Sequence, residues 1–490
     1  MNRPVDVRDI LFGDQWDYSP APQSADFADF EEQYGHYIGG EFVEADDYFQ
    51  SINPATEEPI AEFGIGTEAT VDRAVEAARE GYEEHWKPMP ASERAKYIYR
   101  IGRMIKEKSR EIAVLESMDG GKPIRESRDV DIPLAAAHFF HYAGWADKLE
   151  YSFPGAEPHS LGVCGQVIPW NFPLLMAAWK IAPALATGNT VVIKPAETTP
   201  LTAMKLAEII DEAGFPPGVV NIVNGAGTTG SAVVEHDDVD KVAFTGSTEV
   251  GKVIQRAVAG TDKRLTLELG GKGSNIIFDD AAVDQAVEGI INGIYFNQGH
   301  VCCAGSRLLV QENIHDEVIH KLKQRMETLR IGDPLDKNTD IGAINSKQQL
   351  EKIDRLVDAG VQEGCELHQA SCETPDTGYF FKPTFFTDVT PSHRVAQEEI
   401  FGPVLSVMTF RTPDEAVRKA NNTPYGLACG VWTDKGSKLF RVAGELDCGV
   451  VWGNTYNKFD PGAPFGGYKE SGFGREGGRQ GLLAYLELEE

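Results

Sequence analysis

Apolar residues recur at helical spacing in two long segments near the start of the chain, about 71–86 and 92–118. This spacing gathers the apolar side chains on one face, so it predicts two amphipathic helices. Ahead of them, the stretch 36–47 predicts a short hairpin that turns at Gly39-Gly40. Between 151 and 162 the pattern is polar and is broken by Pro and Gly.

After residue 162 short apolar segments alternate with helical ones. The predicted strands are 191–195, 219–223, 241–246, 275–278 and 308–311, and the later helices are about 281–295 and 315–329. Such alternation is typical of parallel sheets joined by right-handed crossovers. A chain of 490 residues also exceeds what one hydrophobic core supports. The sequence therefore predicts an α/β protein with two or three domains and no internal repeat.

The helix after the first of these strands has recognisable ends. Thr199 can cap it through its side-chain oxygen, and Pro200 fits the first turn because its missing N–H has no partner there. Gly214 can end it, since glycine readily adopts the left-handed conformation found after a helix.

The composition of the chain limits which partners it can bind and indicates its cellular compartment. The net charge of −29 argues against binding to nucleic acid or to an anionic membrane. The longest apolar stretch, 172–186, contains Lys180 and Pro183, so no membrane span is predicted. There is no basic segment followed by an apolar run at the start, and the seven scattered cysteines indicate a reducing compartment. We expect a cytoplasmic protein whose first 35 residues form an acidic extension.

Two glycine-rich turns could hold a dinucleotide. The first, Gly225-Ala-Gly227-Thr-Thr-Gly230, fits the pattern G-x-G-x-x-G, and the second runs from Phe244 to Gly251 with Gly246 at its turn. Each follows a predicted strand and opens a helix, where backbone N–H groups can bind a pyrophosphate. The pattern alone favours the first turn, although a tight turn without a ligand is an equally ordinary use of glycine.

Three polar residues occupy unusual positions. Lys194-Pro-Ala-Glu197 ends a buried-type strand, where open α/β sheets bind ligands, although a solvated strand end fits equally well. Glu268 lies between apolar residues and a Gly-Gly turn, so burial would raise its pKa towards that of a general base unless a salt bridge pairs it. Asn171 sits in a frame of Pro and Trp that suits an oxyanion donor, or a loop amide that bonds to backbone.

The segment FNQGHVCCAGSR carries His300, Cys302 and Cys303. A metal site lacks a second cluster of ligands at suitable spacing, so none is predicted. A Cys–His dyad is the nucleophilic alternative, although the base in such pairs usually comes from elsewhere in the chain. From these residues alone, two buried thiols is the favoured interpretation.

Taken together, the motifs resemble those of the aldehyde dehydrogenase superfamily. They are GVCGQVIPWNFPLLMAAWKIAPALATGNTVVIKPAETTP, FTGSTEVG, LELGGK, FNQGHVCCAGSR, EEIFGPV and PFGGYKESGFGRE. They occur in the family's order and spacing, from about residue 36 to the C-terminus.

The resemblance implies a reaction and its residues. Cys302 would add to an aldehyde to give a thiohemiacetal whose oxyanion contacts Asn171 and the Cys302 N–H. Hydride transfer to NAD would leave a thioester, which water activated by Glu268 would hydrolyse to the acid. Cys303 becomes a neighbour of the nucleophile, and a carboxylate at Glu197 would repel the 2′-phosphate of NADP.

The resemblance also implies residues around the ligands. The expected cofactor contacts are Ile168, Pro169, Trp170, Lys194, Glu197, Gly227, Gly230, Phe244, Gly246, Ser247, Val250, Leu269, Gly270, Glu399 and Phe401. The expected substrate tunnel comprises Phe172, Met176, Trp179, Tyr456, Lys458, Phe459 and Phe465. The pyrophosphate is then expected at Ser247, in the second glycine turn, which reverses the choice made from the pattern alone.

The implied fold is a Rossmann-like cofactor-binding domain, an α/β catalytic domain and a small β oligomerisation arm. The expected boundaries are 1–35 for the extension, 36–141 and 161–270 for the NAD-binding domain, 271–475 for the catalytic domain, and 142–160 with 476–490 for the arm. A homodimer or homotetramer is expected.

Two departures from the family pattern concern the substrate. His300 replaces a residue that is commonly Gln, and Lys458 and Asp460 bring charge near the tunnel, where an ion pair on the rim is the favoured interpretation. The alternatives to a general aldehyde dehydrogenase are a specialised semialdehyde or betaine-aldehyde enzyme and a catalytically silent scaffold of the same fold.

Overall fold

The two amphipathic helices predicted near the N-terminus are present but interrupted. In the computed structural model, which describes residues 19–489, helix α2 (Glu68–Glu80) continues as the π-helical turn Gly81–Trp86. The second predicted helix is two helices, α3 (Ala91–Glu107) and α4 (Ser109–Gly120). They are separated by Lys108, whose φ of −92° and ψ of 12° depart from helical values.

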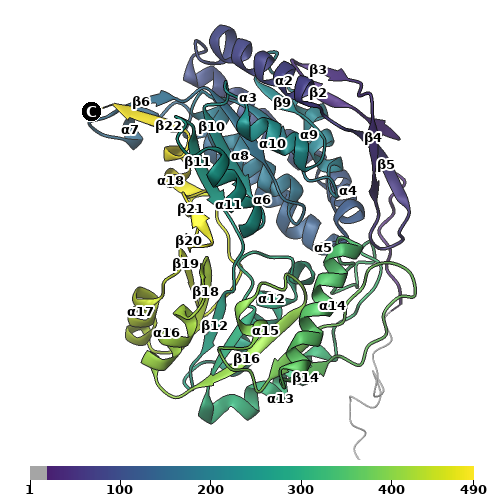
Figure 1. The fold of residues 1–490 in the computed structure, drawn as a ribbon, viewed down its shortest axis with the longest axis vertical. Helices are drawn as coiled ribbons and strands as arrows, with labels where there is room; N and C mark the ends of the chain where they lie inside the picture. The colour runs from purple at the N-terminus through teal and green to yellow at the C-terminus, as the bar shows by residue number, and fades with distance from the viewer. Residues whose placement is uncertain (1–18, 490) are drawn as a thin grey trace, which may run out of the picture.

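An eight-stranded sheet forms the core of the upper lobe in Figure 1. Its order is β21-β11-β10-β7-β8-β9-β2-β3, and the five strands from β11 to β9 are parallel. The strands are β2 (His36–Ile38), β3 (Glu41–Val43), β7 (Val163–Val167), β8 (Thr190–Lys194), β9 (Val220–Ile222), β10 (Lys241–Thr245), β11 (Arg264–Glu268) and β21 (Gly472–Phe473). The predicted hairpin is β2–β3, and the predicted α/β class with parallel strands is confirmed.

Helices follow the strands of this sheet as the crossover pattern predicts. They are α8 (Pro173–Ala186), α9 (Leu201–Glu212), α10 (Gly227–Glu235) and α11 (Thr248–Ala257). The predicted cap of α9 is wrong, because the Thr199 side chain makes no hydrogen bond to the helix and Thr199 Oγ1 has no partner among residues 19–489. Instead the Leu201 N–H donates to Asp119 Oδ2 of α4 at 2.9 Å. Gly214 follows the helix with a φ of 72°, as predicted.

A seven-stranded sheet forms the core of the lower lobe. Its order is β14-β15-β16-β13-β12-β18-β19, and all neighbours except β14 and β15 are parallel. The strands are β12 (Ser274–Ile277), β13 (Arg307–Gln311), β14 (Glu366–Gln369), β15 (Thr384–Thr387), β16 (Val404–Phe410), β18 (Ala428–Trp432) and β19 (Val450–Gly453). The helices include α12 (Val283–Ile294), α13 (His315–Met326), α14 (Lys347–Gln362), α16 (Pro413–Asn421) and α17 (Gly436–Glu445). β11 of the upper sheet leads directly into β12 of the lower one, so residues 269–273 cross between the lobes.

A narrow arm projects from the upper lobe (Figure 1). The segment whose local pattern showed only a polar break, and which the family resemblance assigned to a small β arm, contains α7 (Leu149–Ser152) and β6 (Glu157–Ser160), and β6 pairs antiparallel with β22 (Leu486–Glu489). Local pattern gives little sign of β6, since its only strand partner comes from the far end of the chain. Helices α6 (Ile132–Ala143) and α18 (Gly478–Leu483) lead into the two strands.

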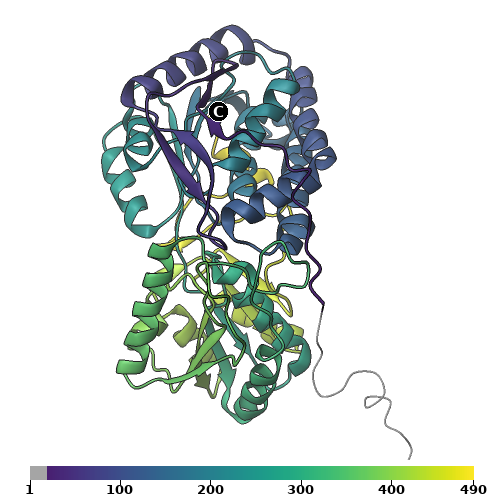
Figure 2. The same ribbon diagram turned by 90° about the vertical axis from the view of Figure 1, so that its right-hand side faces the viewer.

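The described part of the N-terminal segment lies along both lobes, as the dark trace in Figure 2 shows. Residues near 20 meet a loop of the lower lobe, where Gln23 N–H donates to the Leu335 carbonyl at 2.7 Å. The chain then joins a three-stranded sheet of β1 (Gln33–Tyr34), β5 (Pro59–Gly64) and β4 (Tyr48–Ile52). Within residues 19–489 no helix combines the length and apolar character needed to cross a membrane.

Candidate active site

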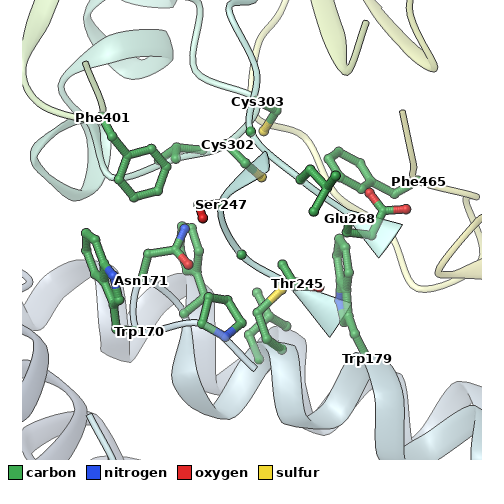
Figure 3. A pocket seen from close by; sticks show the side chains of 18 of the residues that line it. Trp170, Asn171, Trp179, Thr245, Ser247, Glu268, Cys302, Cys303, Phe401 and Phe465 are labelled. Atoms are coloured by element: carbon green, nitrogen blue, oxygen red, sulfur yellow. The ribbon is translucent and has the colours of Figure 1, made fainter. Parts of the chain in front are cut away.

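A cavity lies between the two sheets and contains the residues that the motifs single out. It has an empty volume of about 1080 Å³, part of it open to solvent. Its walls come from the ends of β10 and β11, the loop between β7 and α8, α8 itself, and the loop around Cys302. Figure 3 shows the Cys302 sulfur pointing into this space, with Asn171 and Glu268 on opposite sides of it.

The loop that presents Cys302 is held in an unusual backbone conformation. Asn297 and Gln298 have φ values of 48° and 52°, a region that costs free energy for residues other than glycine. A buried hydrogen bond stabilises this backbone conformation, since Gln298 Nε2 donates to the Ala343 carbonyl at 3.0 Å. The reversal leaves Cys302 partly exposed in the cavity while Cys303 is buried.

The surroundings of the Cys302 sulfur favour the protonated thiol. A hydrogen bond with the Cys303 side chain and then burial raise the pKa of Cys302 well above its usual value, and the nearby Glu399 carboxylate adds to the effect. Cys303 belongs to a second layer, where its carbonyl accepts from the Tyr456 hydroxyl at 2.9 Å. Both cysteines line the cavity, but Cys303 is only 1% exposed while Cys302 is partly exposed, so Cys302 is the more open to a ligand, and it must lose its proton before it can react.

Asn171 is fixed beside the cysteine by two hydrogen bonds. The Asn171 side-chain Nδ2 donates to the backbone carbonyl of His300 at 2.8 Å. The backbone carbonyl of Asn171 accepts from Asn297 Nδ2 at 2.8 Å. An amide nitrogen has two N–H groups, so one remains for a ligand in the cavity. The frame of Pro and Trp predicted from sequence thus holds an amide that can donate next to Cys302.

His300 fills an aromatic slot. Its ring meets Trp170 edge-on with centroids 4.8 Å apart and stacks on Phe401 with centroids 5.8 Å apart. Burial lowers the pKa of His300 to about 3, and the cation of Lys122 acts in the same direction. The imidazole is therefore neutral at physiological pH, and only its backbone carbonyl touches the Cys302 neighbourhood, through Asn171.

Replacing His300 should consequently leave the pH dependence unchanged. We expect His300→Gln to keep the ionisations seen in a profile of kcat/KM between pH 5 and 9, because a group with a pKa of about 3 has lost its proton throughout that range. A profile whose acid limb moves in the variant would contradict this and would make His300 a titrating partner of the thiol. The matched control is Phe401→Leu, which alters the same slot without changing a titratable group.

Glu268 is a buried carboxyl at the end of β11, with an exposed fraction of 5%. Neither oxygen has a hydrogen-bond partner among the described residues. Burial raises the pKa of Glu268 well above its usual value, and the Glu476 carboxylate raises it further while Lys180 acts in the opposite direction. The raised pKa makes the Glu268 carboxylate a stronger base towards a proton of water.

Behind Glu268 lies a buried ion pair that the sequence did not single out as functional. Lys180 Nζ of α8 contacts Glu476 Oε1, and both side chains are almost fully buried. Glu476 also lines the cavity. In the sequence, Lys180 is a lone cation in an apolar stretch. Because a buried cation requires a counter-charge, this position could have indicated a buried ion pair.

The expected cofactor contacts fall into two groups. Those that line the cavity are Pro169, Trp170, Gly246, Ser247, Leu269, Gly270, Glu399 and Phe401. Those that lie outside its lining are Ile168, Lys194, Glu197, Gly227, Gly230, Phe244 and Val250. The cavity therefore reaches the second glycine turn at Gly246 and not the first at Gly225–Gly227.

The second turn forms a cradle that a side chain would fill. A Cβ at Gly246 would collide with the Phe244 ring, and one at Gly270 would collide with Glu399. Ser247 caps α11, since its Oγ accepts from the Val250 N–H at 3.3 Å. The helix thus begins at the cavity, with its positive end available to an anion such as a pyrophosphate.

One carboxylate lies beside this cradle and another at the end of β8, outside the cavity lining. Glu399 Oε1 accepts from the Gly271 N–H at 2.8 Å, and burial raises the pKa of Glu399. At the end of β8, Lys194 Nζ lies 3.1 Å from Glu197 Oε2, and Lys194 is buried while Glu197 is half-exposed. Both pairs offer the hydrogen-bonding groups that ribose hydroxyls require.

The substrate end of the cavity is aromatic. Of the expected tunnel residues, Phe172, Met176, Trp179, Phe459 and Phe465 line it, and Trp179 packs on Phe465 with ring centroids 5.3 Å apart. Further apolar lining that the sequence did not identify comes from Val130, Leu134, Leu175, Phe296 and Val301.

Tyr456 and Lys458 do not line this space. The Tyr456 ring is buried behind Cys303, packed against Gly430, because its hydroxyl bonds to the Cys303 carbonyl. Lys458 is exposed, and its carbonyl accepts from Trp452 Nε1 at 2.9 Å. Asp460 is exposed too and accepts from its own loop at Gly462. The predicted charge therefore lies outside the cavity wall.

No ligand set for a metal ion is found in the part of the chain that the structure describes. No group of three or more His, Cys, Asp or Glu side chains is arranged to hold one there. The chemistry available in the cavity is that of a thiol, an amide and a buried carboxyl beside a glycine-lined helix start.

Comparison with known proteins gives one consistent family. The family model described as "Aldehyde dehydrogenase family" matches residues 42–490. The mitochondrial aldehyde dehydrogenase of Homo sapiens is 47% identical over 454 residues, which cover 90% of this chain and 87% of that protein.

Solved structures agree with this match. An NAD+ complex of the aldehyde dehydrogenase from Bacillus cereus has a TM-score of 0.91 and 43% identity, and the alignment covers 94% of this chain and 96% of that one. Betaine aldehyde dehydrogenase from Staphylococcus aureus, also solved with NAD+, has a TM-score of 0.89 and 40% identity over 93% and 94% of the two chains. The chain belongs to the aldehyde dehydrogenase family.

Proposed function

We propose that this protein oxidises an aldehyde to the carboxylic acid with NAD as the hydride acceptor. One observation carries the proposal: Cys302, Asn171 and Glu268 face a single cavity that extends to the glycine cradle at Gly246. The related enzymes solved with NAD+ support the choice of cofactor. A pyrophosphate in the cavity is supported by the N-terminus of α11, which begins after Ser247 at the cavity wall.

The reaction begins at the sulfur. Cys302 loses its proton and its thiolate adds to the aldehyde carbon, giving a thiohemiacetal whose oxyanion accepts from Asn171 Nδ2. The second Nδ2 hydrogen suits this role, since the first is held by the His300 carbonyl. When bound, NAD supplies the acceptor for the hydride that leaves this carbon, and a thioester on Cys302 results.

Glu268 completes the reaction as the general base. It takes a proton from water, the hydroxide attacks the thioester carbon, and the C–S bond breaks to release the acid and the Cys302 thiolate. Burial and the neighbouring Glu476 raise the pKa of Glu268, which makes its carboxylate a stronger base. Lys180 holds Glu476 in place.

Preference for NAD over NADP is assigned to Glu197. Its carboxylate stands half-exposed beside Lys194 at the end of β8, and at this position it would repel a ribose 2′-phosphate. We expect Glu197→Gln to lower the KM for NADP by about tenfold, because removal of one repulsive charge at the surface is worth about 1.4 kcal/mol. Steady-state KM values for both cofactors measure this, with Glu235→Gln on α10 as the control. A lower KM for NADP than for NAD in the unmodified enzyme would refute the assignment.

The lining of the cavity also bears on the aldehyde. Its aromatic rings favour uncharged or cationic substrates over carboxylated ones, and Lys458 lies outside. Values of kcat/KM over a panel of aliphatic, aromatic, cationic and carboxylated aldehydes test this ranking. A preference for the cationic member would favour a betaine-aldehyde enzyme, and a preference for the carboxylated member a semialdehyde enzyme. Failure to form NADH from propanal or hexanal, with Cys302 inert to iodoacetamide, would instead support a silent scaffold.

Assembly and location complete the proposal. We place the protein in the cytoplasm as a homodimer or homotetramer. All seven cysteines are free, which suits a reducing compartment. Tyr151 on the arm and Phe440 on α17 are each 81% exposed, which suits burial against another copy. A monomer mass from light scattering would contradict the assembly.

We also propose the domain boundaries stated above, with β21 contributed to the cofactor-binding sheet from within 271–475.

A further inference from the structure

A short segment where the two lobes meet places a buried carboxyl beneath the loop that presents Cys302. Helix α5 (Ile124–Glu126) is followed by the π-helical turn Ser127–Asp131, and it lies at the boundary of the lobes in Figure 1. The Ile124 N–H donates to the carbonyl of Pro334 in the lower lobe at 2.7 Å. The last two residues of the π-helical turn line the cavity. The segment is therefore part of the wall of the candidate active site.

The carboxyl at the end of α5 accepts a hydrogen bond from the cysteine loop. Glu126 is 7% exposed, and its Oε2 accepts from the backbone N–H of Asn297 at 2.9 Å. Burial raises the pKa of Glu126 to about 8, while the Asn297 N–H and the charge of Arg125 act in the opposite direction. The carboxyl is therefore mainly protonated at pH 7 and serves as a hydrogen-bond acceptor, a role that an amide oxygen can also fill.

Asn297 connects this carboxyl to the reacting groups. It has a φ of 48° and reverses the chain ahead of Cys302. The Asn297 carbonyl accepts from the His300 N–H at 2.8 Å, and Asn297 Nδ2 donates to the backbone carbonyl of Asn171 at 2.8 Å. The Asn171 side chain in turn donates to the His300 carbonyl at 2.8 Å. Glu126 therefore holds a residue that bonds both to the oxyanion donor and to the cysteine loop.

The hydrogen bond from Asn297 to Glu126 matters because the loop is strained and buried. A residue other than glycine keeps a left-handed conformation only while its surroundings hold it there. Asn297 is 2% exposed, so without Glu126 its N–H would lose its acceptor in a site that water does not reach. We expect the loop to shift in response and to carry Cys302 and the Asn171 amide with it. Displacement of a reacting group by about 1 Å can lower a rate by about 100-fold.

A buried ion pair fixes the segment that carries Glu126. Lys122 Nζ contacts Asp131 Oδ2 and lies 3.7 Å from Glu116 Oε1, and these three side chains are at most 2% exposed. The Lys122 ammonium also lies 4.2 Å from the centre of the Phe172 ring, which lines the cavity. These contacts tie both ends of the segment to the buried core, so the Glu126 carboxyl has a fixed place beneath the loop.

We propose that Glu126 is a positioning residue for aldehyde oxidation, which acts through Asn297 to align Cys302 and the Asn171 amide for attack on the aldehyde. The inference rests on the proposed function, since it concerns the rate of that reaction. Glu126 does not line the cavity, so it touches neither substrate nor cofactor there. The property that matters is the place of its acceptor oxygen and not its charge.

Two substitutions separate the place of the oxygen from its charge. Glu126→Gln keeps an acceptor oxygen at the same distance along the side chain, whereas Glu126→Asp keeps the carboxyl but withdraws it by one methylene. Stopped-flow absorbance with NAD and hexanal measures the rate of the NADH burst. We expect this rate to stay close to the parent's in Glu126→Gln and to fall by about 10- to 100-fold in Glu126→Asp. The Kd for NAD should be unchanged in both, because the glycine cradle at Gly246 does not involve this contact.

Asp119 offers the matched control. It is 1% exposed and accepts from the Leu201 N–H at 2.9 Å, so it too is a buried carboxyl that binds a backbone N–H. Asp119→Ala should lower Tm and keep the parent's burst rate, because its hydrogen bond ends on α9 and not on the cysteine loop. The comparison separates a loss of stability from a loss of alignment.

Hydrogen–deuterium exchange follows the same contact without turnover. A peptic peptide that spans 296–301 should exchange faster in Glu126→Asp than in the parent, and at the parent's rate in Glu126→Gln. The proposal is overturned if Glu126→Asp keeps the parent's burst rate or its exchange, or if Glu126→Gln is the slow variant, which would make the charge the essential property. A parent enzyme that forms no NADH would refute the proposed function, whereas a normal parent burst with an equally fast Glu126→Asp would refute only the role of Glu126.

Discussion

Glu268→Gln is expected to form NADH in a rapid burst, close to one equivalent per active site, and then to stall. The first half of the reaction uses the Cys302 thiol and the Asn171 amide, which the substitution leaves in place. The second half needs a base for water, and an amide cannot accept that proton. General-base catalysis typically contributes about 10²- to 10⁴-fold, so we expect the steady-state rate to fall by that amount.

Stopped-flow absorbance of NADH measures both phases of this reaction. Glu235→Gln, which alters an exposed carboxylate at the end of α10, should retain the parent's steady-state rate. A Glu268→Gln enzyme with an unchanged steady-state rate would remove Glu268 from the mechanism. A variant that lost the burst as well would show that the carboxyl acts before the thioester forms, as the group that takes the Cys302 proton.

Cys302→Ala is expected to abolish NADH formation, with a fall in kcat of at least about 10⁴-fold, because removal of a nucleophile leaves only binding and oxyanion stabilisation. NAD binding should survive, since the cradle at Gly246 and the Glu399 contact to Gly271 do not involve the sulfur. Steady-state kinetics and the quenching of tryptophan fluorescence by NAD measure the two properties separately.

The neighbouring cysteine supplies the matched control. Cys303→Ala should retain activity, and it should let iodoacetamide react with Cys302 at lower pH, because the hydrogen bond to Cys303 is the main cause of the raised pKa of Cys302. If Cys303→Ala were the inactive variant and Cys302→Ala the active one, the assignment of the nucleophile would be reversed.

The sequence predicted the candidate site well where a residue contradicted its local surroundings. Glu268 between apolar residues and Asn171 in a Pro-Trp frame were identified in this way, and both face the cavity. Local pattern could not choose Cys302 over Cys303 or the second glycine turn over the first. Those choices came from the combination of motifs: the cavity reaches Gly246 and not Gly225–Gly227, whereas both cysteines line it and differ in that Cys302 is the more exposed.

The features that the sequence missed depend on contacts between distant segments. Lys180 and Glu476 are 296 residues apart in the chain and meet only in the folded protein. The cap of α9 comes from Asp119 on another helix, 82 residues earlier, and not from the adjacent Thr199. Tyr456 follows β19 near the expected tunnel. Its hydroxyl donates a hydrogen bond to the Cys303 carbonyl, and the ring therefore lies outside the cavity lining.

The covalent intermediate on Cys302 is the central claim, and mass spectrometry of Glu268→Gln tests it most directly. After one turnover with NAD and hexanal, a rapid acid quench and trypsin digestion, peptide 273–307 should carry one hexanoyl group on Cys302, and the same experiment on Cys302→Ala should give none. A burst of NADH with no acyl group on this peptide, or an acyl group located on Cys303, would contradict the account.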